Sequence, residues 1–546
     1  MQQKISIQLL PQQTSDSRSV LHTIATTSGL KIKDITGYHI VKKSIDARGK
    51  TICINMTVNV FIKEPFQQRT IPEFRFQEVS LSQKRIVIIG GGPAGLFAAL
   101  QLIEHGIKPI IIERGKDVKE RRRDIAALNK KGIINPESNY CFGEGGAGTY
   151  SDGKLYTRSN KRGNIDRILN LFVHFGAGEE ILYEAHPHMG TNKLPGIITA
   201  MRKCILDCGG EFYFNKKVID FIIEGDIIKS IKTADGDSYK ADSFILATGH
   251  SARDIFSLLH EKKLLIIARP FALGVRVEHP QELINNIQYA KSGIRNNTIN
   301  VGGTFLPPAS YSLVEQVDKR GVFSFCMCPG GIIAPAATGN GELVVNGWSP
   351  SKRNNPYANS GLVVQAETED VFNYMKPYPK KDELLYDPAS PLHMMYFQRS
   401  IEQKAFDSGG GNFVAPAQRL VDFTENKFSS SLPKCSYIPG IQSAQLNDVL
   451  PDFISTRLKK ALKSFGKKMP ARNGNSSYFT NEAVLVATES RTSSPVRIPR
   501  DEHFLHHPQI KNLFPCGEGA GYAGGIVSAA MDGERIANTI SVLLDA

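Results

Sequence analysis

The stretch RIVIIGGGPAGLFAALQLI, residues 85 to 103, constrains the fold of this chain more than any other segment. Its eighteen residues from Ile86 to Ile103 carry no charge, which on hydropathy alone is typical of a short membrane span. However, the β-branched run from Ile86 to Ile89 ends at Gly90-Gly91-Gly92-Pro93, a sequence that interrupts a continuous helix. We therefore expect a buried strand followed by a turn, not a membrane helix.

The residues after this turn predict a helix and then a second strand. Good helix formers run from Ala94 to His105, and Gly106 is suited to the C-terminal cap of a helix. The segment KPIIIERG that follows has the composition of another buried strand. Together these elements predict a β-α-β unit.

The glycines of this unit have the spacing of a dinucleotide-binding turn. Gly90, Gly92 and Gly95 fit the pattern G-x-G-x-x-G, and Glu113 lies at the end of the second strand, where an acid can bind ribose hydroxyls. In such units the first glycine permits the tight turn, the second lets the backbone approach a pyrophosphate, and the third allows close helix packing. The helix N-terminus then offers free N–H groups to the phosphates.

Composition predicts an ordinary globular protein of two to four domains. Of the 546 residues, 41% are hydrophobic and 22% are charged, and no signal peptide is recognisable at the N-terminus. Eight cysteines are too few for a disulfide scaffold, so we expect mostly reduced thiols and a cytoplasmic protein. The net charge of +13 permits anionic ligands, nucleic acid or membrane surfaces but selects none of them.

The N-terminal residues, 1 to about 80, are predicted to form a separate β-α-β-β module. They contain 11 Lys and Arg against 6 Asp and Glu, so contact with RNA is one interpretation. No aromatic stacking pattern accompanies the charge, which favours a solvated face on an accessory domain. A polar, proline-containing linker follows and leads to the first strand of the dinucleotide unit.

Three further glycine-rich segments accompany the first. FGEGGAGTYSDGKLYTR contains Gly146, Ala147, Gly148 and Thr149, in a loop that either clears space for a flat ring or is a flexible turn. In YKADSFILATGHSARD, a strand at 243–246 precedes Ala247, Thr248 and Gly249. Near the C-terminus, a short strand to Cys516, a glycine-rich loop and a helix starting near Gly525 or Ile526 repeat this order. Strands that are each followed by a glycine-rich turn, and that lie so far apart in the chain, favour one long ligand. FAD fits this pattern better than NAD.

These motifs together resemble the uncharacterised FAD-dependent dehydrogenases of bacteria, within the glutathione-reductase-type flavoprotein superfamily. The resemblance rests on GGGPAGLFAA, FGEGGAGTYSDGKLYTR, ATGHSARD and CGEGAGYAGGIVSAAMDGERIA, and it spans residues 84 to 546. It implies FAD, and because no motif for covalent attachment is recognisable, we expect the FAD to be bound non-covalently. The residues implied at the adenosine and pyrophosphate end are Gly90, Gly92, Pro93, Ala94, Gly95, Glu113, Arg114 and, through its backbone, Val218. Those implied at the ribityl chain and flavin are Gly517, Glu518, Gly525 and Ile526.

The predicted fold class is therefore α/β, with a Rossmann-type FAD-binding domain assembled from discontinuous segments. The expected divisions are an accessory module at 1–80, FAD-binding segments at 84–264 and 481–546, and an inserted α+β substrate domain at 265–480. No second strand followed by G-x-G-x-x-G is found, so we expect no separate NAD domain. Electrons would then come from a substrate, from NADH or NADPH docking transiently beside the flavin, or from a partner protein.

No catalytic acid or base and no metal site is assigned. Cys326 and Cys328, two residues apart on a predicted strand, would face one side and could pass electrons, although buried core cysteines are the more common case. Cys204 and Cys208 have helical spacing but lack a second ligand pair for zinc. The basic helix STRLKKALKSFGKK, residues 455 to 468, has one apolar side and is expected to lie on the surface.

The function predicted from the sequence is that of an FAD-dependent oxidoreductase, which transfers hydride at the flavin ring to or from a small molecule. An FAD-containing RNA-modifying or RNA-binding protein is the main alternative, and it would show salt-dependent RNA retention. A lipid reductase held at a membrane surface is a third interpretation. Substrate, electron donor and oligomeric state are left open.

Overall fold

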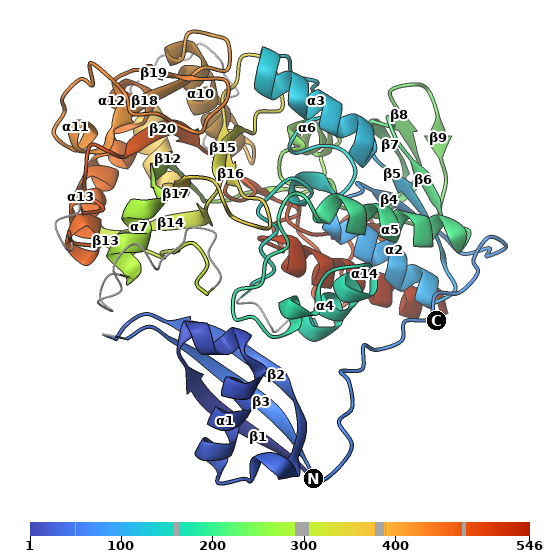
Figure 1. Cartoon of the computed structure of the whole chain (residues 1–546). Helices are drawn as coiled ribbons and strands as arrows, with labels where there is room; N and C mark the ends of the chain where they lie inside the picture. Colours follow the sequence, from blue (N-terminus) through green and yellow to red (C-terminus); the bar gives the residue numbers. More distant parts are fainter. Residues whose placement is uncertain are drawn as a thin grey trace.

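A computed structural model describes residues 1–49, 51–157, 163–289, 305–376, 387, 389–471 and 477–545. Three units are visible in Figure 1: an N-terminal module drawn in blue, a unit built on a parallel sheet, and a unit drawn mainly in yellow and orange around a larger mixed sheet. None of the helices within the described ranges combines the length and apolar character needed to cross a membrane. Residues 86–103 instead contribute to a strand and a helix of twelve residues.

The N-terminal module contains three antiparallel strands and one helix, in the chain order that the sequence predicts. Its sheet has the order β1-β3-β2, and apolar side chains alternate along β1 and β3 toward α1. The elements are β1 (Gln2–Leu9), α1 (Ser17–Ser28), β2 (Ile35–Asp46) and β3 (Cys53–Ile62). Asp16 caps α1 by accepting hydrogen bonds from the backbone N–H groups of Arg18 and Ser19.

Backbone and core contacts join this module to the rest of the chain. The N–H of Lys43, in β2, donates to the carbonyl of Tyr183, and the N–H of Ala185 donates to the carbonyl of Lys43. At the end of the β2–β3 hairpin, Ile52 is buried in the core of the third unit. The module is therefore packed against both other units.

The second unit is a five-stranded, fully parallel sheet of order β22-β10-β4-β5-β6. Its strands are short and apolar because both faces of the sheet are covered. They are β4 (Arg85–Ile89), β5 (Lys108–Ile112), β6 (Glu211–Tyr213), β10 (Ser243–Leu246) and β22 (Leu513–Pro515). The C-terminal strand β22 pairs with β10, so this sheet is completed by segments that are about 270 residues apart in the chain.

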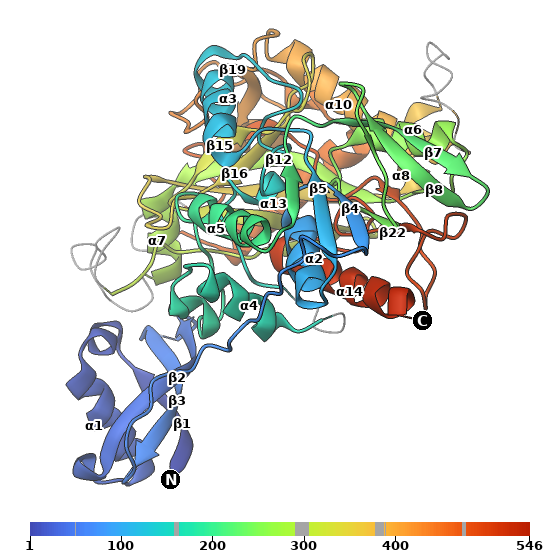
Figure 2. The same cartoon turned by 90° about the vertical axis from the view of Figure 1, so that its right-hand side faces the viewer.

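Helices cover one face of the parallel sheet, and a three-stranded antiparallel sheet with a helix covers the other. The strands of the small sheet are β7 (Val218–Glu224), β8 (Ile227–Thr233) and β9 (Ser238–Tyr239). The helices of the second unit are α2 (Pro93–Glu104), α3 (Val118–Lys131), α4 (Ile165–His174), α5 (Leu194–Asp207), α6 (Arg253–Glu261) and α14 (Ile526–Asp545). Helices α2 and α14 lie side by side in both views (Figures 1 and 2). In the sequence, α2 is the first helix of the second unit and α14 is its last.

The third unit is built on a seven-stranded mixed sheet of order β13-β14-β17-β12-β20-β18-β19. Its strands are β12 (Phe271–Pro280), β13 (Val314–Val317), β14 (Arg320–Pro329), β17 (Tyr357–Ala366), β18 (Ala415–Arg419), β19 (Ile441–Ser443) and β20 (Val484–Glu489). Strand β20 lies beyond residue 480, where the sequence predicts the start of the C-terminal segment, and it pairs with β12 and β18.

Helices and two small ribbons complete the third unit. The helices are α7 (Gln281–Tyr289), α8 (Thr368–Met375), α10 (His393–Ser408), α11 (Leu420–Thr424), α12 (Leu446–Val449) and α13 (Asp452–Lys468). The ribbons pair β11 (Ile267–Ala268) with β21 (Val496–Arg497) and β15 (Ile332–Pro335) with β16 (Val345–Trp348). The basic helix expected on the surface is α13, which buries Leu458, Leu462 and Phe465 against the sheet.

Gly95 allows α2 to pack closely on the turn that follows β4. A Cβ at this position would lie 2.1 Å from the carbonyl oxygen of Gly90 and 3.1 Å from Cγ2 of Ile88. Both neighbours belong to the tightly held strand and turn, so neither can move away at small cost. The third glycine of the motif thus fixes where the N-terminus of α2 lies.

Gly95→Ala should therefore lower the free energy of unfolding by about 1–3 kcal/mol, because the added methyl group overpacks the turn. Urea denaturation of the purified protein measures this loss. Gly196→Ala, also within a helix, is the matched control, since an added Cβ there meets nothing within 4 Å. Equal stability of Gly95→Ala and the wild type would show that α2 does not pack this closely on the turn after β4 in solution.

Candidate functional site

A large cavity lies at the carboxyl ends of the parallel strands and faces the third unit. Its volume is about 1490 Å³. Segments that directly follow β4, β5, β10 and β22 line it, which is the edge where open α/β sheets bind ligands. Pockets for single small ligands usually have volumes of roughly 300–1,000 Å³, so this cavity has room for more than one of them.

The turn after β4 presents an uncapped helix N-terminus to the cavity. Gly90, Gly92, Pro93 and Ala94 line the cavity, and no side chain caps the first turn of α2. The first N–H groups of a helix have no partner within the helix and attract anions. This corner of the cavity is therefore suited to a phosphate-containing group.

Glu113, at the end of β5, uses most of its capacity to accept hydrogen bonds for backbone N–H groups of glycines. Its Oε1 accepts from the N–H groups of Gly115 at 2.9 Å and Gly143 at 3.0 Å, and its Oε2 accepts from the N–H of Gly91 at 2.8 Å. A carboxylate oxygen accepts about two hydrogen bonds, so only Oε2 retains room for one more donor. The carboxylate thus ties two loops together and also reaches the cavity wall.

Arg114 follows Glu113 and is held in a fixed orientation. Its guanidinium forms ion pairs with Glu137 at 2.6 Å and Asp254 at 3.0 Å, and it lies over the ring of Phe142 with 4.1 Å between Cζ and the ring centroid. Arg114 and Phe142 both line the cavity. The pair with Asp254 connects the end of β5 to the start of α6, and the pair with Glu137 connects it to the segment after α3.

A fully buried guanidinium organises the loop at 138–149. Arg121, in α3, donates hydrogen bonds of 2.7–3.2 Å to six oxygens of this loop: the carbonyls of Asn139, Tyr140, Gly143, Glu144 and Gly146, and Oγ1 of Thr149. The backbone of Gly143 lies so close to the Arg121 side chain that only glycine fits, because a Cβ there would lie 2.4 Å from Cδ of Arg121. The sequence alone is compatible with two interpretations of this loop, a shaped wall or a flexible turn. The structure shows a shaped wall.

The C-terminal segment brings a partly buried carboxyl group and a helix N-terminus to the same cavity. Gly517, Glu518, Gly525 and Ile526 line it, and α14 begins at Ile526. Burial raises the pKa of Glu518 to about 7, and no described residue donates a hydrogen bond to its carboxyl oxygens. The closest ionisable partner is Nε2 of His250 at 3.8 Å.

The structure brings together nearly all of the residues that the sequence predicts for a cofactor. Gly95 and Thr149 are the exceptions, since neither lines the cavity. Gly95 packs behind the first turn, and the Thr149 hydroxyl accepts from Arg121 and donates to the carbonyl of Glu144. The predicted residues that line the cavity are Gly90, Gly92, Pro93, Ala94, Glu113, Arg114, Gly146, Ala147, Gly148, Val218, Ala247, Thr248, Gly249, Gly517, Glu518, Gly525 and Ile526.

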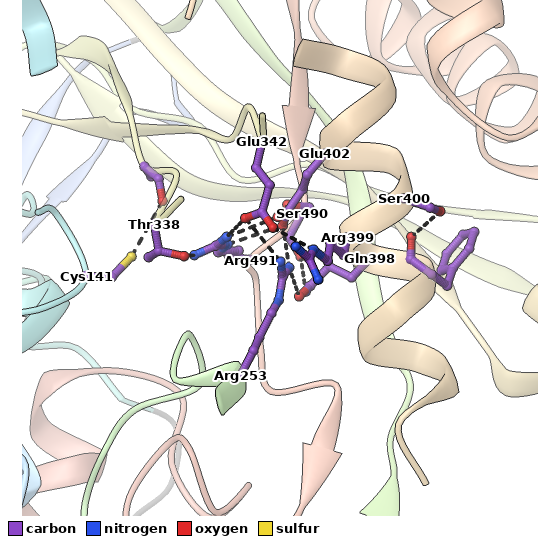
Figure 3. A network of polar contacts seen from close by, with 12 residues as sticks. Cys141, Arg253, Thr338, Glu342, Gln398, Arg399, Ser400, Glu402, Ser490 and Arg491 are labelled. Atoms are coloured by element: carbon purple, nitrogen blue, oxygen red, sulfur yellow. Dashed lines mark hydrogen bonds and ion pairs between the residues drawn. The ribbon is translucent and has the colours of Figure 1, made fainter. Parts of the chain in front are cut away.

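A network of buried ion pairs joins the second and third units beside this cavity (Figure 3). Arg253, at the start of α6, pairs with Glu402 of α10 at 2.9 Å and with Glu342 at 3.3 Å. Arg491, which lines the cavity, pairs with the same two carboxylates at 3.0 and 3.1 Å. A third cation, the partly exposed Arg399 of α10, pairs with Glu342 at 2.9 Å, so three cations surround two anions. The pairs of Arg253 link the second unit to the third. Burial, with Arg491 and Arg253 nearby, lowers the pKa of His250 to about 4.

Strand β14 of the third unit contributes the opposite wall but not the arrangement predicted for its cysteines. The register of β14 against β17 shifts between Phe325 and Cys328, and Cys326 has a φ of +47°. Cys326 is exposed to the cavity, whereas Cys328 is buried. The expectation that both thiols face one side of a regular strand is therefore wrong, because a bulge separates them. Among the described residues no cluster of three potential metal ligands occurs.

Comparison with known families matches three consecutive parts of the chain. Residues 84–267 match the family model described as pyridine nucleotide-disulphide oxidoreductase. Residues 270–492 match FAD-dependent protein, C-terminal domain-like. Residues 1–61 match a domain of unknown function.

Similar proteins and structures were also found. An uncharacterised protein of Clostridium beijerinckii is 39% identical over 528 residues, which cover 93% of both chains. The structure of L-proline dehydrogenase from P. horikoshii is 12% identical, with a TM-score of 0.33, and covers 84% of this chain and 93% of that one. The structure of 2,6-dihydroxypyridine-3-hydroxylase from Arthrobacter nicotinovorans is 11% identical, with a TM-score of 0.33, and covers 85% and 84%.

Arg121→Met should lower the free energy of unfolding by at least about 3 kcal/mol, because it leaves several buried carbonyl groups without a donor. Hydrogen exchange should become faster specifically in residues 139–146. Arg122→Met is the matched control, since Arg122 is exposed on the same helix, and it should change stability by less than about 0.5 kcal/mol. Unchanged exchange in the loop of Arg121→Met would contradict its role.

Proposed function

The chain belongs to the same family as the Clostridium beijerinckii protein and is an FAD-dependent oxidoreductase, and we propose that it transfers hydride between FAD and a small molecule bound in the cavity. The observation that carries the proposal is the continuity of this cavity. The second unit lines one side with four glycine-containing segments, and the third unit lines the other with polar and apolar side chains. One cavity can thus place a cofactor and a substrate in contact.

The glycines of the cavity wall fit a large flat cofactor. A Cβ added at Gly524 or Gly525 would meet no protein atom within 4 Å, and neither residue has a positive φ, so neither packing nor backbone conformation requires glycine there. Both line the cavity. Side chains at these positions would occupy ligand space, which supports a cofactor that lies directly against the backbone.

We assign the adenosine and diphosphate part of FAD to the corner beside β4 and β5. Gly90, Gly92 and the N-terminus of α2 would bind the phosphates through backbone N–H groups. The remaining acceptor site on Oε2 of Glu113 would take a ribose hydroxyl, while Arg114, fixed over Phe142, would border the adenosine. Val218, at the start of β7, lines the same region.

We assign the ribityl chain and flavin to the part of the cavity between residues 146–148 and the start of α14. The Glu518 carboxyl, which lacks a protein donor among the described residues, would accept hydrogen bonds from ribityl hydroxyls. The N-terminus of α14 would favour negative charge that develops next to it. When bound, FAD supplies the hydride-transfer chemistry, and these residues bind and orient it.

The electron donor shares this cavity in our proposal. The sheets of the described residues include only one parallel sheet with a glycine-rich turn, so a nicotinamide nucleotide would have no second dinucleotide domain to occupy. NADH or NADPH would therefore dock transiently against the same cavity, or a small-molecule substrate would itself be the donor. The match to the pyridine nucleotide-disulphide oxidoreductase family supports the nicotinamide donor.

Purified protein should be yellow, with FAD that heat or acid releases, because the predicted contacts are non-covalent. Anaerobic titration with NADH, NADPH and a panel of metabolites, followed through the visible flavin spectrum, should identify a reductant. Colourless protein that takes up no added FAD would overturn the proposal. Retained FAD that no compound of the panel reduces would overturn its redox part.

Glu518→Gln should stabilise the FAD-free protein at pH 8 but not at pH 5. The folded pKa of about 7 exceeds the ordinary value of 4.5, so the folded chain holds a proton that the unfolded chain has lost between these values. The stability of the wild type therefore falls as pH rises through this window, by about 1–3 kcal/mol. Thermal unfolding of wild type and variant across pH measures this difference.

The same variant should bind FAD more weakly than the wild type at pH 8, because an amide is a poorer acceptor than a carboxylate for ribityl hydroxyls. Glu502→Gln, at an exposed carboxylate, is the matched control and should change neither property. A pH-independent difference between wild type and Glu518→Gln would contradict the burial argument. Unchanged FAD affinity would contradict the contact with the ribityl chain.

A further inference from the structure

Two cations lie together in the part of the cavity that the loop at 150–157 shares with the third unit. Lys154 and Arg353 both line the cavity, and both approach the buried carboxylate of Asp152. The Nζ of Lys154 lies 3.5 Å from Oδ2 of Asp152, and the guanidinium of Arg353 donates to the same oxygen at 3.0 Å. A single carboxylate is thus shared by two cations from different units.

The other charges close to this pair are already matched. Arg276 is fully buried, and its Nη1 donates to both carboxylate oxygens of Glu489, at 2.9 and 3.0 Å. Glu184, the next carboxylate near Arg353, lies beside Lys43 in the backbone bridge to the N-terminal module. Among the described residues, Asp152 is the only carboxylate within ion-pair distance of Lys154 or Arg353, so the two cations share one anion and one positive charge remains in excess.

The remaining titratable groups do not supply the missing negative charge at neutral pH. Cys328 lies 3.8 Å from Nζ of Lys154, but burial raises the pKa of its thiol to about 11. Burial and the neighbouring Arg353 lower the pKa of His188 to about 4, so its ring is neutral. Lys154 and Arg353 hold the pKa of Asp152 below its ordinary value against the effect of burial, so that carboxylate is already ionised.

Both cations retain unused donor capacity. The Lys154 side chain is 34% exposed, toward the cavity that it lines, and its contacts with Asp152 and Cys328 are long for hydrogen bonds. The Nε of Arg353 is buried and has no hydrogen-bond partner among the described residues. A buried donor without an acceptor is costly unless a ligand supplies one.

Apolar side chains line the same cavity as these donors, together with polar ones. Tyr156 follows Lys154 in the loop, and Phe325 and Met327 lie on the bulged strand β14 with Ser324. A ligand that matches this composition has an apolar or aromatic body and one anionic group. Because the excess amounts to a single charge, a carboxylate balances it better than a phosphate dianion.

We propose that Lys154 and Arg353 form the subsite for the carboxylate of the substrate, so that the enzyme oxidises or reduces a small carboxylate-bearing molecule with an apolar body. This inference rests on the proposed function, because it assigns the substrate class of the same cavity. Asp152 acts as a positioning residue that holds the two cations together.

The test is a spectroscopic titration of the FAD-bound protein with benzoate and with benzamide, its neutral isostere. Benzoate should perturb the visible flavin spectrum saturably, and benzamide should bind at least roughly tenfold more weakly. Lys154→Met should weaken benzoate binding by a similar factor and leave benzamide unchanged, whereas Lys154→Arg should retain most of the affinity. Lys352→Met, at the exposed residue beside Arg353, is the matched control and should behave as wild type.

Equal affinity for benzoate and benzamide, or benzoate binding that Lys154→Met does not weaken, would overturn the subsite. If Lys154→Met shifts the reduction potential of the flavin while the preference for benzoate persists, the charge of Lys154 serves the cofactor, and the proposal is also wrong. Each of these results leaves FAD binding and reduction intact, so they differ from a failure of the proposed function, which would appear as the absence of bound or reducible FAD.

Discussion

The buried guanidinium of Arg121 determines the shape of the cavity wall. Its six hydrogen bonds go to oxygens of the loop at 138–149. The carboxylate of Glu113 accepts hydrogen bonds from the N–H groups of Gly91, Gly115 and Gly143. One cation and one anion thus satisfy backbone groups that a glycine-rich loop leaves without partners. Because these partners belong to the protein, the wall forms without help from a ligand and is preorganised for one.

The second and third units are held across the cavity by charge as well as by apolar packing. Burying Arg253, Arg491, Glu342 and Glu402 costs solvation, and this cost is recovered only when every group keeps its geometry. Loss of one partner would leave a buried charge unmatched. Such a network therefore disfavours sliding of the two units and keeps the wall formed by β14 at a constant distance from the glycine-rich segments.

Patterns over several residues could be predicted from the sequence, whereas contacts between distant side chains could not. The strand at 85–89, the turn and α2 follow from β-branched runs and glycine spacing, which are local signals. Arg121 is one of three consecutive arginines, and no local pattern distinguishes it from its exposed neighbour Arg122. Lys154 and Arg353 are about 200 residues apart, so only the fold brings them together. The bulge at Cys326 likewise depends on the partner strand β17.

The same distinction explains the N-terminal module. Its excess of basic residues is compatible with a nucleic-acid contact on composition alone, but the structure uses its edge strand for a different contact. The pairing of Lys43 with residues 183–185 anchors the start of the segment that continues through His186 and Pro187 along the cavity. Ile52 adds an apolar anchor in the core of the third unit. Because two different units bind the module, its removal would free part of the cavity wall, which gives the module a structural role in the site.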